Sequence, residues 1–411
     1  MIPSGWQKLA FGDIASRLTR KNTELNDNVL TISALDGLVS QEKYFNKRVA
    51  GKNLSNYFLL HRGDFAYNKS FSRGFPVGAI KRLDHEDKGV VSPIYLCFEL
   101  AKEDLVDSDF LAHLCSSELL TPDIRLIAKQ GARAHGALNI KPADFFGIRI
   151  KLPPLPEQKK IAEILGSVDE AIQKTQAVIS QTERVKKGLL QELLTRGMPG
   201  RHTRFKKTEI GEIPADWEVV TIGDVAEVRN GSTPRKNNPT YWTNGTIPWL
   251  PTGKVNERII SMADQFITTI ALDECPLRIL PVGSVLMAMI GQGKTRGKVA
   301  LLDIEATINQ NFASIVPGES IDSAFLFHLL ESSYQRLRSS GRGSNQDALN
   351  CKIVRDSLLA LPVMGEQQEI ASIADGIDRQ VDQNRRFLDT LQRAKRGLTN
   401  DLLTGKVRVK V

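Results

Sequence analysis

One stretch of this chain has the residue types and spacing of a phosphate-binding loop. Residues 288–295 read AMIGQGKT, which fits the permissive (A/G)xxxxGK(S/T) pattern. Such a loop binds phosphate through the free backbone N–H groups of a helix that begins directly after it. Here Arg296 and Gly297 are followed by KVALLD, which predicts a strand. We therefore expect no ATP site at this position.

Other catalytic motifs are missing from the sequence. It contains no Asn/Asp-Pro-Pro-aromatic motif of amino-methyltransferases, no dinucleotide fingerprint, and no HExxH spacing among its six histidines. Its four cysteines lie far apart without a CxxC pair, which argues against a zinc site and fits a reducing, cytoplasmic compartment. The sequence contains no run of 18 apolar residues, so no membrane-spanning helix is predicted. We expect a chain with no catalytic residues, no metal and no membrane contact.

Polar, glycine-rich loops are the remaining candidates for chemistry. They span residues 68–76, 129–136, 230–242, 291–298 and 338–346. Arg, Lys, Asn and Gln hydrogen-bond base edges and phosphates, and glycine lets backbone approach closely. Lys plus Arg number 55 against 47 Asp plus Glu, a formal charge of +8 that favours a polyanionic partner. We predict contact with double-stranded DNA, although ordinary surface loops are also polar and glycine-rich.

An internal repeat determines how these loops are positioned. Residues 152–172 and 361–381 match at an offset of 209 with eight of 21 identities, and 184–195 and 393–404 match with seven of 12. Weaker matches lie upstream, including FLAHLCSS (110–117) with FLFHLLESS (325–333). The chain is predicted to be two copies of one unit, each a variable globular part followed by a shared tail.

Each tail predicts a long helix of a coiled coil. Apolar residues recur at steps of four and three, and about 39 residues at 1.5 Å per residue would make a rod of roughly 58 Å. Parallel and antiparallel pairing are both topologically open. Leu190 and Leu194 lie beside the seam with nothing assigned to cover them, from which we infer helices of another subunit. The expected partner-binding residues are Ile161, Leu165, Leu190, Leu194, Ile370, Ile377, Leu398 and Leu402. The alternative is a two-helix hairpin packed on its own globular domains.

The globular parts predict an α+β fold with antiparallel sheets. Short apolar runs separated by Gly and Asn indicate hairpins at 64–70, 77–83 and 90–100, and again at 284–290, 297–303 and 313–317. Amphipathic helical segments follow at about 108–120 and 322–338. The predicted domains are 1–152 and 201–361, and the predicted helical regions are 153–200 and 362–411. The tryptophans are expected to pack in the cores or hairpins rather than stack on bases.

These motifs together resemble one family. The tandem P-x-x-W…GD units, the LPP-PEQ-x-IA helix starts and the LLT helix ends resemble the specificity subunit of type I restriction–modification systems. The GSTP…YW…IPW stretch (231–249) and the GxGxTxG-like segment (291–297) are similar to its target-recognition domains. The resemblance covers essentially the whole chain.

The resemblance implies a non-catalytic DNA-binding subunit. Each globular part would be a target-recognition domain that reads one half of a split DNA sequence, and an antiparallel coiled coil would separate the two half-sites. Two modification subunits would dock on the helices, carry S-adenosylmethionine and methylate adenine. Restriction subunits would supply ATP- and Mg-dependent translocation and cleavage.

The DNA-binding candidates follow from the loops. In the first unit, which lacks a GSTP…YW segment, they are Asn68, Lys69, Ser70, Arg73, Arg133 and His135. In the second unit they are Thr233, Arg235, Gln292, Lys294, Thr295, Arg296, Asn345 and Gln346. Arg, Asn and Gln are expected to read bases, and Lys to contact phosphates. The Arg296→Ala variant is predicted to weaken binding at one half-site only.

Two other functions remain open on the sequence. A single-chain DNA modification or restriction enzyme with a diverged active site would cleave or methylate DNA by itself. A coiled-coil scaffold with protein-binding end domains would show no salt-sensitive binding to any duplex.

Overall fold

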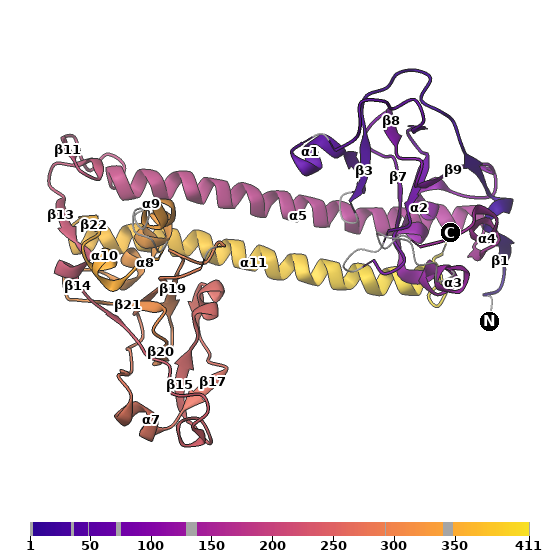
Figure 1. Ribbon diagram of the computed structural model, residues 1–411. Coiled ribbons are helices and arrows are strands. Elements are labelled where there is room, and N and C mark those ends of the chain that lie inside the picture. The colour runs from indigo at the N-terminus through magenta and orange to yellow at the C-terminus, as the bar shows by residue number, and fades with distance from the viewer. Residues whose placement is uncertain are drawn as a thin grey trace. The chain divides into compact units, whose positions relative to one another are not determined.

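A computed structural model describes residues 3–33, 37–47, 49–70, 75–128, 138–291, 293–339 and 348–410. The chain divides into two compact units. Unit 1 is Met1–Gln176 with Arg386–Val411, and unit 2 is Ala177–Arg385. Each unit contains one globular part and a portion of each of two long helices, α5 (Leu155–Arg196) and α11 (Met364–Leu403) (Figure 1).

The globular part of unit 1 is built from short strands and helices. Its described strands are β1 (Gln7–Ala10), β2 (Ala15–Leu18), β3 (Leu30–Ser33), β4 (Gly37–Ser40), β5 (Phe58–His61), β6 (Phe65–Asn68), β7 (Ala79–Arg82), β8 (Lys88–Val91), β9 (Leu96–Leu100) and β10 (Arg149–Leu152). Its helices are η1 (Phe11–Asp13), α1 (Gln41–Phe45), α2 (Ser108–Ser116), η2 (Glu118–Leu120), α3 (Thr121–Ile127) and α4 (Pro142–Phe146). The central antiparallel sheet has the order β2-β9-β6-β7, and β1 pairs with β10.

Unit 2 repeats this plan with additions. Its strands are β11 (Phe205–Thr208), β12 (Gly211–Pro214), β13 (Glu218–Thr221), β14 (Ala226–Asn230), β15 (Ile247–Leu250), β16 (Ile259–Ile260), β17 (Gln265–Ile267), β18 (Val285–Ala288), β19 (Val299–Leu302), β20 (Thr307–Ile308), β21 (Phe312–Pro317) and β22 (Leu358–Leu361). Its helices are α6 (Ile222–Val225), η3 (Pro239–Tyr241), η4 (Thr252–Glu257), α7 (Thr269–Glu274), α8 (Ser323–Ser332), α9 (Tyr334–Ser339) and α10 (Cys351–Arg355).

The two central sheets have equivalent topology. The order β14-β21-β18-β19 in unit 2 repeats β2-β9-β6-β7 in unit 1, and β16 extends the sheet of unit 2 beyond β19. The α+β class is confirmed, and strands and helices form where they were predicted, except that 90–100 divides into β8 and β9 of different sheets and 322–338 divides into α8 and α9. One expectation needs refinement, because β15 pairs with β20 and β16 with β19 in parallel. These two-residue parallel pairs join segments far apart in the chain, so no local hairpin signal predicts them.

The long helices are paired antiparallel within each unit. In unit 2, Lys186 Nζ of α5 lies 2.5 Å from Asp378 Oδ1 of α11. In unit 1, Asp169 of α5 forms an ion pair with Lys395 of α11. A second contact in each unit gives the direction. In unit 2, Glu183 of α5 pairs with Arg385 of α11, and in unit 1, Glu157 of α5 pairs with Arg408 beyond α11, so an earlier residue of α5 contacts a later residue of the C-terminal segment. Gly197 and Gly405 follow the helices with φ of +75° and +70°, as expected for glycine after a helix end.

The expected partner-binding seam is largely covered by the chain itself. Leu190 and Leu194 are each 5% exposed and pack in the core of unit 2 with Trp217 and the α8 residues. The inference that another subunit covers them is therefore wrong, because the second globular part does so. Ile161, Leu165 and Leu402 are buried in the core of unit 1, and Ile370 is buried in the core of unit 2; Ile377 and Leu398 are half-buried.

In unit 1, a buried glutamate fixes the first turn of α5. Glu157 is 3% exposed, and its carboxylate accepts a hydrogen bond from the indole of Trp6 at 3.3 Å. Arg408, beyond the end of α11, donates to both carboxylate oxygens at 2.6 and 2.8 Å. The P-x-x-W motif thus places its tryptophan against the glutamate of the PEQ motif, 151 residues away.

Unit 2 has the same arrangement around Glu366. The indole of Trp217 donates to Glu366 at 3.0 Å, while the Met198 N–H and His202 donate at 2.9 Å. Met198 and His202 lie just beyond the end of α5. In both units, therefore, the start of one long helix is bonded to the segment that follows the other. Burial alone would raise the pKa of Glu366, but these hydrogen bonds bring it below its ordinary value.

The glutamine after each glutamate fixes the globular part to the helix start. Gln158 and Gln367 are both fully buried. Their side-chain oxygens accept from the N–H groups of Asp107 (2.9 Å) and Asp322 (2.8 Å), the residues that cap α2 and α8. Their amide groups donate to the carbonyls of Leu105 and Pro153 in unit 1 and of Ser320 and Pro362 in unit 2. The repeated motifs are thus structural contacts.

Across the described ranges, no helix carries an apolar stretch sufficient to span a bilayer.

Candidate nucleic-acid interface

In unit 2 the candidate loops leave the central sheet at one edge. β14 and β18 both run antiparallel to β21, so the ends of β14 and β18 and the start of β21 lie together. The loop after β14 and the hairpin after β18 therefore emerge beside the 309–311 turn. The Met289 N–H donates to the Asn311 carbonyl at 2.9 Å, and the Leu349 N–H donates to Met289 at 2.9 Å. Sequence reasoning predicted the loops but not their convergence.

The loop after β14 begins in a close backbone contact. A β-carbon on Gly231 would lie 1.9 Å from the carbonyl oxygen of Ile308, so only glycine fits there. The Ser232 N–H donates to that same carbonyl at 3.0 Å, and Trp249 donates its indole N–H to Ser232 at 3.0 Å. Thr233 donates to the Gln310 side chain at 2.5 Å. The start of this loop is therefore rigidly held, with Thr233 half-buried.

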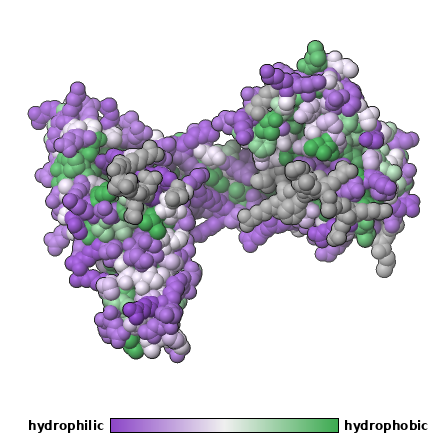
Figure 2. All heavy atoms as spheres, viewed as in Figure 1, coloured by the Kyte–Doolittle hydropathy of each residue, from purple (hydrophilic) through white to green (hydrophobic). Residues whose placement is uncertain are grey.

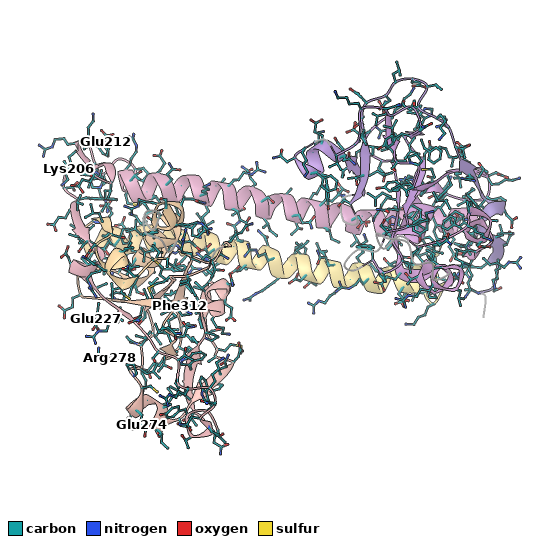
Figure 3. The ribbon with its side chains drawn as sticks, in the orientation of Figure 1. Lys206, Glu212, Glu227, Glu274, Arg278 and Phe312 are labelled. Atoms are coloured by element: carbon teal, nitrogen blue, oxygen red, sulfur yellow. The ribbon has the colours of Figure 1, made fainter. Side chains whose placement is uncertain are left out.

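Aromatic side chains fix the outer part of this loop. The Tyr241 hydroxyl donates to Glu274 at 2.7 Å, and the indole of Trp242 donates to the Arg235 carbonyl at 3.2 Å. The ring of Trp242 packs edge-on against Trp249, which is 2% exposed, so the expected packing role of the tryptophans is confirmed there. The Arg235 side chain is exposed. Figure 3 places Glu274 at the tip of unit 2 that carries α7, far from the buried Phe312.

The phosphate-loop pattern folds as a hairpin turn between β18 and β19. The Gly297 N–H donates to the Ala288 carbonyl and the Ala288 N–H to the Lys298 carbonyl, both at 2.9 Å. The turn is thus followed by a strand, as expected, and not by the helix that a phosphate loop requires. Lys294 is exposed and Thr295 half-buried, and Tyr334 donates to the Lys294 carbonyl at 2.9 Å.

Arg296 lies differently from an exposed base-reading side chain. It is 5% exposed, and its guanidinium donates to the Arg338 carbonyl at 3.4 Å. A buried arginine with a backbone partner supports the hairpin rather than presenting donors outside it. The Arg296→Ala experiment would therefore report on hairpin stability as well as on DNA contact.

In unit 1, the equivalent sheet edge carries the first set of candidates. Asn68 ends β6, and its side-chain oxygen accepts from the Ser70 N–H at 3.1 Å. The Lys69 carbonyl accepts from the Leu138 N–H at 2.9 Å, which joins the ends of both candidate loops of this unit. Asn68, Lys69 and Ser70 are all half-buried. Six other candidates lie outside the described residues: Arg73, Arg133, His135, Gln292, Asn345 and Gln346.

Sequence reasoning missed several exposed polar residues at the edge in unit 2. Gln310 is exposed in the turn between β20 and β21 and accepts from Thr233. Lys236 and Asn237 are exposed beside Arg235. The run NQN (309–311) between two apolar strands was a usable turn signal. Hydrophilic residues also predominate on the face of unit 2 shown in Figure 2, around β15 and α7.

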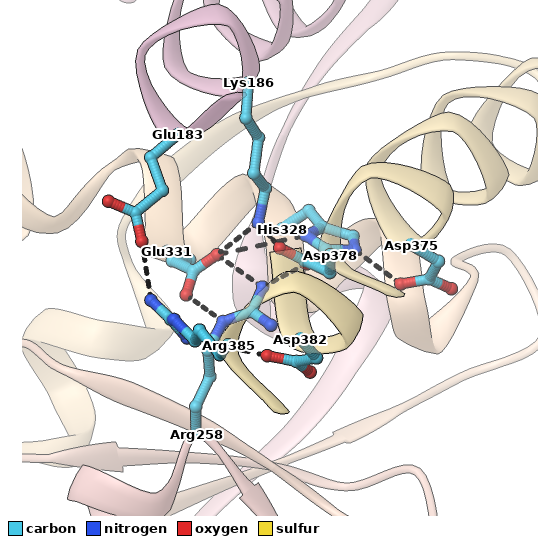
Figure 4. A network of polar contacts seen from close by, with 9 residues as sticks. All are labelled: Glu183, Lys186, Arg258, His328, Glu331, Asp375, Asp378, Asp382 and Arg385. Atoms are coloured by element: carbon cyan, nitrogen blue, oxygen red, sulfur yellow. Dashed lines mark hydrogen bonds and ion pairs between the residues drawn. The ribbon is translucent and has the colours of Figure 1, made fainter. Parts of the chain in front are cut away.

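A second polar site in unit 2 lies between the globular part and the helices (Figure 4). Arg258 donates to both oxygens of Glu331 at 2.5 and 2.8 Å and to Asp378 at 2.6 Å. Lys186 bonds the other oxygen of Asp378, and fully buried His328 lies 2.8 Å from Asp375. This network is called the unit 2 charge network below.

The charge network is poorly suited to a metal ion. His328, Asp375 and Asp378 offer ligand atoms within 4.8 Å of one another. However, Lys186 and Arg258 already neutralise both oxygens of Asp378 and would repel a cation. Burial lowers the pKa of His328, and the charges of Lys186 and Arg258 add to this effect against the hydrogen bond with Asp375. The network is therefore a set of ion pairs around a neutral histidine.

Arg258 adopts a strained backbone conformation to reach this network. Its φ is +63° and its ψ is −50°, a region that non-glycine residues rarely occupy. Its guanidinium lies over the Phe327 ring, 4.9 Å from the centroid. Burial alone would lower the pKa of Arg258, but Glu331 and Asp378 raise it above its ordinary value. The surrounding ion pairs offset the cost of the strain.

Comparison with known proteins accounts for both repeats. The family model for the type I restriction modification DNA specificity domain matches residues 3–184 and 214–393. The MjaVIII specificity subunit of Methanocaldococcus jannaschii is 32% identical over 431 aligned residues, covering 100% of this chain and 94% of that protein. The EcoR124I/EcoR124II specificity subunit of Escherichia coli is 26% identical over 42% of each chain.

A solved structure supports the fold. The S subunit of a type I restriction–modification system from M. genitalium aligns with a TM-score of 0.59 and 13% identity, over 97% of this chain and 96% of that one. The duplicated family match covers most of the sequence, and the first relative matches from end to end. This chain therefore belongs to the family of type I restriction–modification DNA specificity proteins.

Proposed function

We propose that this chain is the DNA-reading, non-catalytic subunit of a type I restriction–modification complex, and that each unit reads one half of a bipartite target. The observation that carries the proposal is the repeated sheet edge. In unit 2, the polar loops after β14 and β18 begin at adjoining strand ends. In unit 1, the loop after β6 begins at the equivalent edge, where the Lys69 carbonyl accepts from the Leu138 N–H. Side chains supported in this way can hydrogen-bond base edges with a defined geometry.

We further propose that residues 1–152 and 201–361 are the target-recognition domains and that 153–200 and 362–411 form the spacer. A helix of 42 residues is about 63 Å long at 1.5 Å per residue. Half-sites read from one DNA face lie about 34–36 Å apart. The length of the helices would then fix the number of unread bases between the half-sites.

Modification subunits are proposed to dock on the helices, two per chain, and to carry the S-adenosylmethionine. Since the chain itself covers most of the seam, we expect the docking surface to consist of apolar side chains that are exposed on the helices. In unit 2, Val178 and Val185 are 49% and 51% exposed on one face of α5, seven residues apart. Restriction subunits with ATP and Mg would complete the system in the cytoplasm, where host DNA lies.

The proposal is tested by mapping methylated adenines in host DNA with and without this gene. A split motif methylated only when the gene is present is the expected result. Cleavage or methylation by the purified chain alone would instead support the single-chain enzyme. The absence of salt-sensitive duplex binding would support the scaffold.

Single variants locate the interface within unit 2. Arg235→Ala should cost about 1–3 kcal/mol at one half-site and leave the other unchanged. Lys294→Ala should weaken binding to all sequences alike and reduce the salt slope by about one. Arg278→Ala is the matched control, because Arg278 is also exposed but pairs with Glu227 at the opposite end of β14 (Figure 3). Equal losses in all three variants would remove the sheet edge from the proposal.

A further inference from the structure

Unit 1 contains a cavity at the position where unit 2 contains its charge network. The cavity has a volume of about 660 Å³ and lies between the globular part and the helices. Lys81 and Ser116 line it from the globular side, and Gly166, Asp169 and Lys395 line it from the helices. Its volume is within the usual range for small-ligand sites.

The repeat shows which residues of the two sites correspond. Helices α2 and α8 align because each begins at an aspartate that accepts a 2.9 Å hydrogen bond from the third helical N–H. The long helices align at the offset of 209. The equivalent pairs, with unit 1 first, are His113 and His328, Ser116 and Glu331, Gly166 and Asp375, Asp169 and Asp378, and Lys395 and Lys186.

Two carboxylates of unit 2 are therefore missing from unit 1. Where unit 2 has Glu331, unit 1 has the hydroxyl of Ser116, and where unit 2 has Asp375, unit 1 has Gly166. A β-carbon on Gly166 would meet no atom within 4 Å, so the position is open. The cavity thus lies where unit 1 lacks two acidic side chains that unit 2 has.

Unit 1 nevertheless has positively charged side chains at this site, as unit 2 does. Lys395 pairs with Asp169, and Lys81 of β7 donates to Ser116 Oγ at 3.4 Å. Lys81 supplies a positive charge from the globular part, as Arg258 does in unit 2. Burial lowers the pKa of Lys81, and the positive charge of Lys395 lowers it further against the attraction of Asp169. Lys81 and Lys395 therefore repel each other at one end of the cavity, where Asp169 is the carboxylate that pairs with Lys395.

Other acids that line the cavity already have partners. Asp84 and Asp109 both bond Arg82 at 2.6 Å, and Glu163 bonds Lys160 at 2.8 Å. Asp107 also lines the cavity and accepts from the Phe110 N–H at 2.9 Å, and Asp84 partly offsets the repulsion between Lys81 and Lys395. Lys159 adds a further exposed cation to the lining.

We propose that this cavity is a binding site for a small oxyanion, a phosphate or carboxylate group, held between Lys81 and Lys395 with the Ser116 hydroxyl as a further donor. The bound group takes the place that the Glu331 carboxylate occupies in unit 2. It supplies the missing negative charge and joins the globular part of unit 1 to its helices. None of the described DNA-binding candidates lines the cavity, and the proposal does not depend on the proposed function.

The decisive experiment is calorimetric titration of the full chain with inorganic phosphate, and in parallel with acetate, at constant chloride. Saturable binding that Ser116→Glu weakens at least tenfold is expected, because the new carboxylate reaches Lys81 as Glu331 reaches Arg258. The thermal midpoint of Ser116→Glu without phosphate should not fall, which separates loss of the site from loss of fold. Tighter phosphate than acetate binding assigns a phosphate ligand; the reverse order assigns a carboxylate.

A matched charge control separates this site from general attraction to a basic protein. Ser261→Glu adds the same charge at an exposed serine of unit 2 and should leave phosphate affinity unchanged. Lys81→Met should abolish the binding that Ser116→Glu weakens. Absence of binding to the unmodified chain, or equal affinity in Ser116→Glu and the unmodified chain, would overturn the proposal. Phosphate that binds only to surface lysines would give equal affinity in Ser116→Glu and in the unmodified chain.

Discussion

Units 1 and 2 hold their globular parts on the helix starts in the same way but differ further along the helices. In both, a Trp–Glu contact and a buried glutamine fix the first helical turn. About three turns later, unit 2 closes the junction with five charged groups around His328, whereas unit 1 leaves a cavity. The contacts at the helix starts are therefore the same in both repeats. The contacts about three turns later, between the globular part and the helices, differ between them.

The largest loss of stability is expected at the helix starts, where both units have equivalent contacts. Glu366→Ala leaves the Trp217 indole, the Met198 N–H and His202 without their shared acceptor. Loss of these buried bonds should destabilise unit 2 by about 3 kcal/mol. Hydrogen exchange followed by mass spectrometry should show faster exchange in unit 2 and little change in unit 1. Glu157→Ala should give the converse pattern. Faster exchange spread evenly over both units in either variant would show that each glutamate does not stabilise its own unit alone.

The helices, strands and repeat could be predicted because their signals are local or appear by self-comparison. Heptad steps gave α5 and α11 to within a few residues, and the hairpin glycines gave β18 and β19. The role of Glu157 could not be predicted, because its partner Trp6 lies 151 residues away. For the same reason sequence reasoning misjudged Leu190, which a distant globular part covers, and it could not predict that Arg296 is buried.

An intermediate effect is expected at Arg258, a contact that unit 2 alone possesses. Arg258→Ala removes the guanidinium from Glu331 and Asp378 and should cost about 2 kcal/mol. Arg258→Gly loses the same contacts but adopts the positive φ without strain, so it should be about 1 kcal/mol more stable than the alanine variant. Urea unfolding monitored at both units measures both values. An alanine variant at least as stable as the glycine variant would show that the positive φ at residue 258 does not destabilise the fold.

The smallest effect concerns pH, and it should appear in both units. Burial lowers the pKa of His328 and of His113 below the ordinary value of 6.5. Asp375, Lys186, Arg258 and Glu331 face His328. Because the unfolded chain takes up these protons first, stability is complete above pH 6.5 and falls as the pH drops toward the folded-state values. The slope is at most about 1.4 kcal/mol per pH unit for each histidine.

The measurement is urea unfolding at pH 7.5, 6.5 and 5.5 for the unmodified chain and for the His328→Asn and His113→Asn variants. Each variant should flatten the pH dependence of its own unit only. If stability rises on acidification instead, the histidines are charged in the folded state and the sign assigned here is reversed.

The division of the chain has a consequence for the order of events during synthesis. Unit 2 is one uninterrupted stretch, Ala177–Arg385, whereas the core of unit 1 includes Leu402 and Leu403 from the far side of that stretch. Domains generally fold in the order in which the ribosome releases them. Here the core of the globular part made first is completed only when Leu402 and Leu403 have been made, after the whole of unit 2. A released chain truncated before Arg386 should therefore fold unit 2 but leave the core of unit 1 without Leu402 and Leu403.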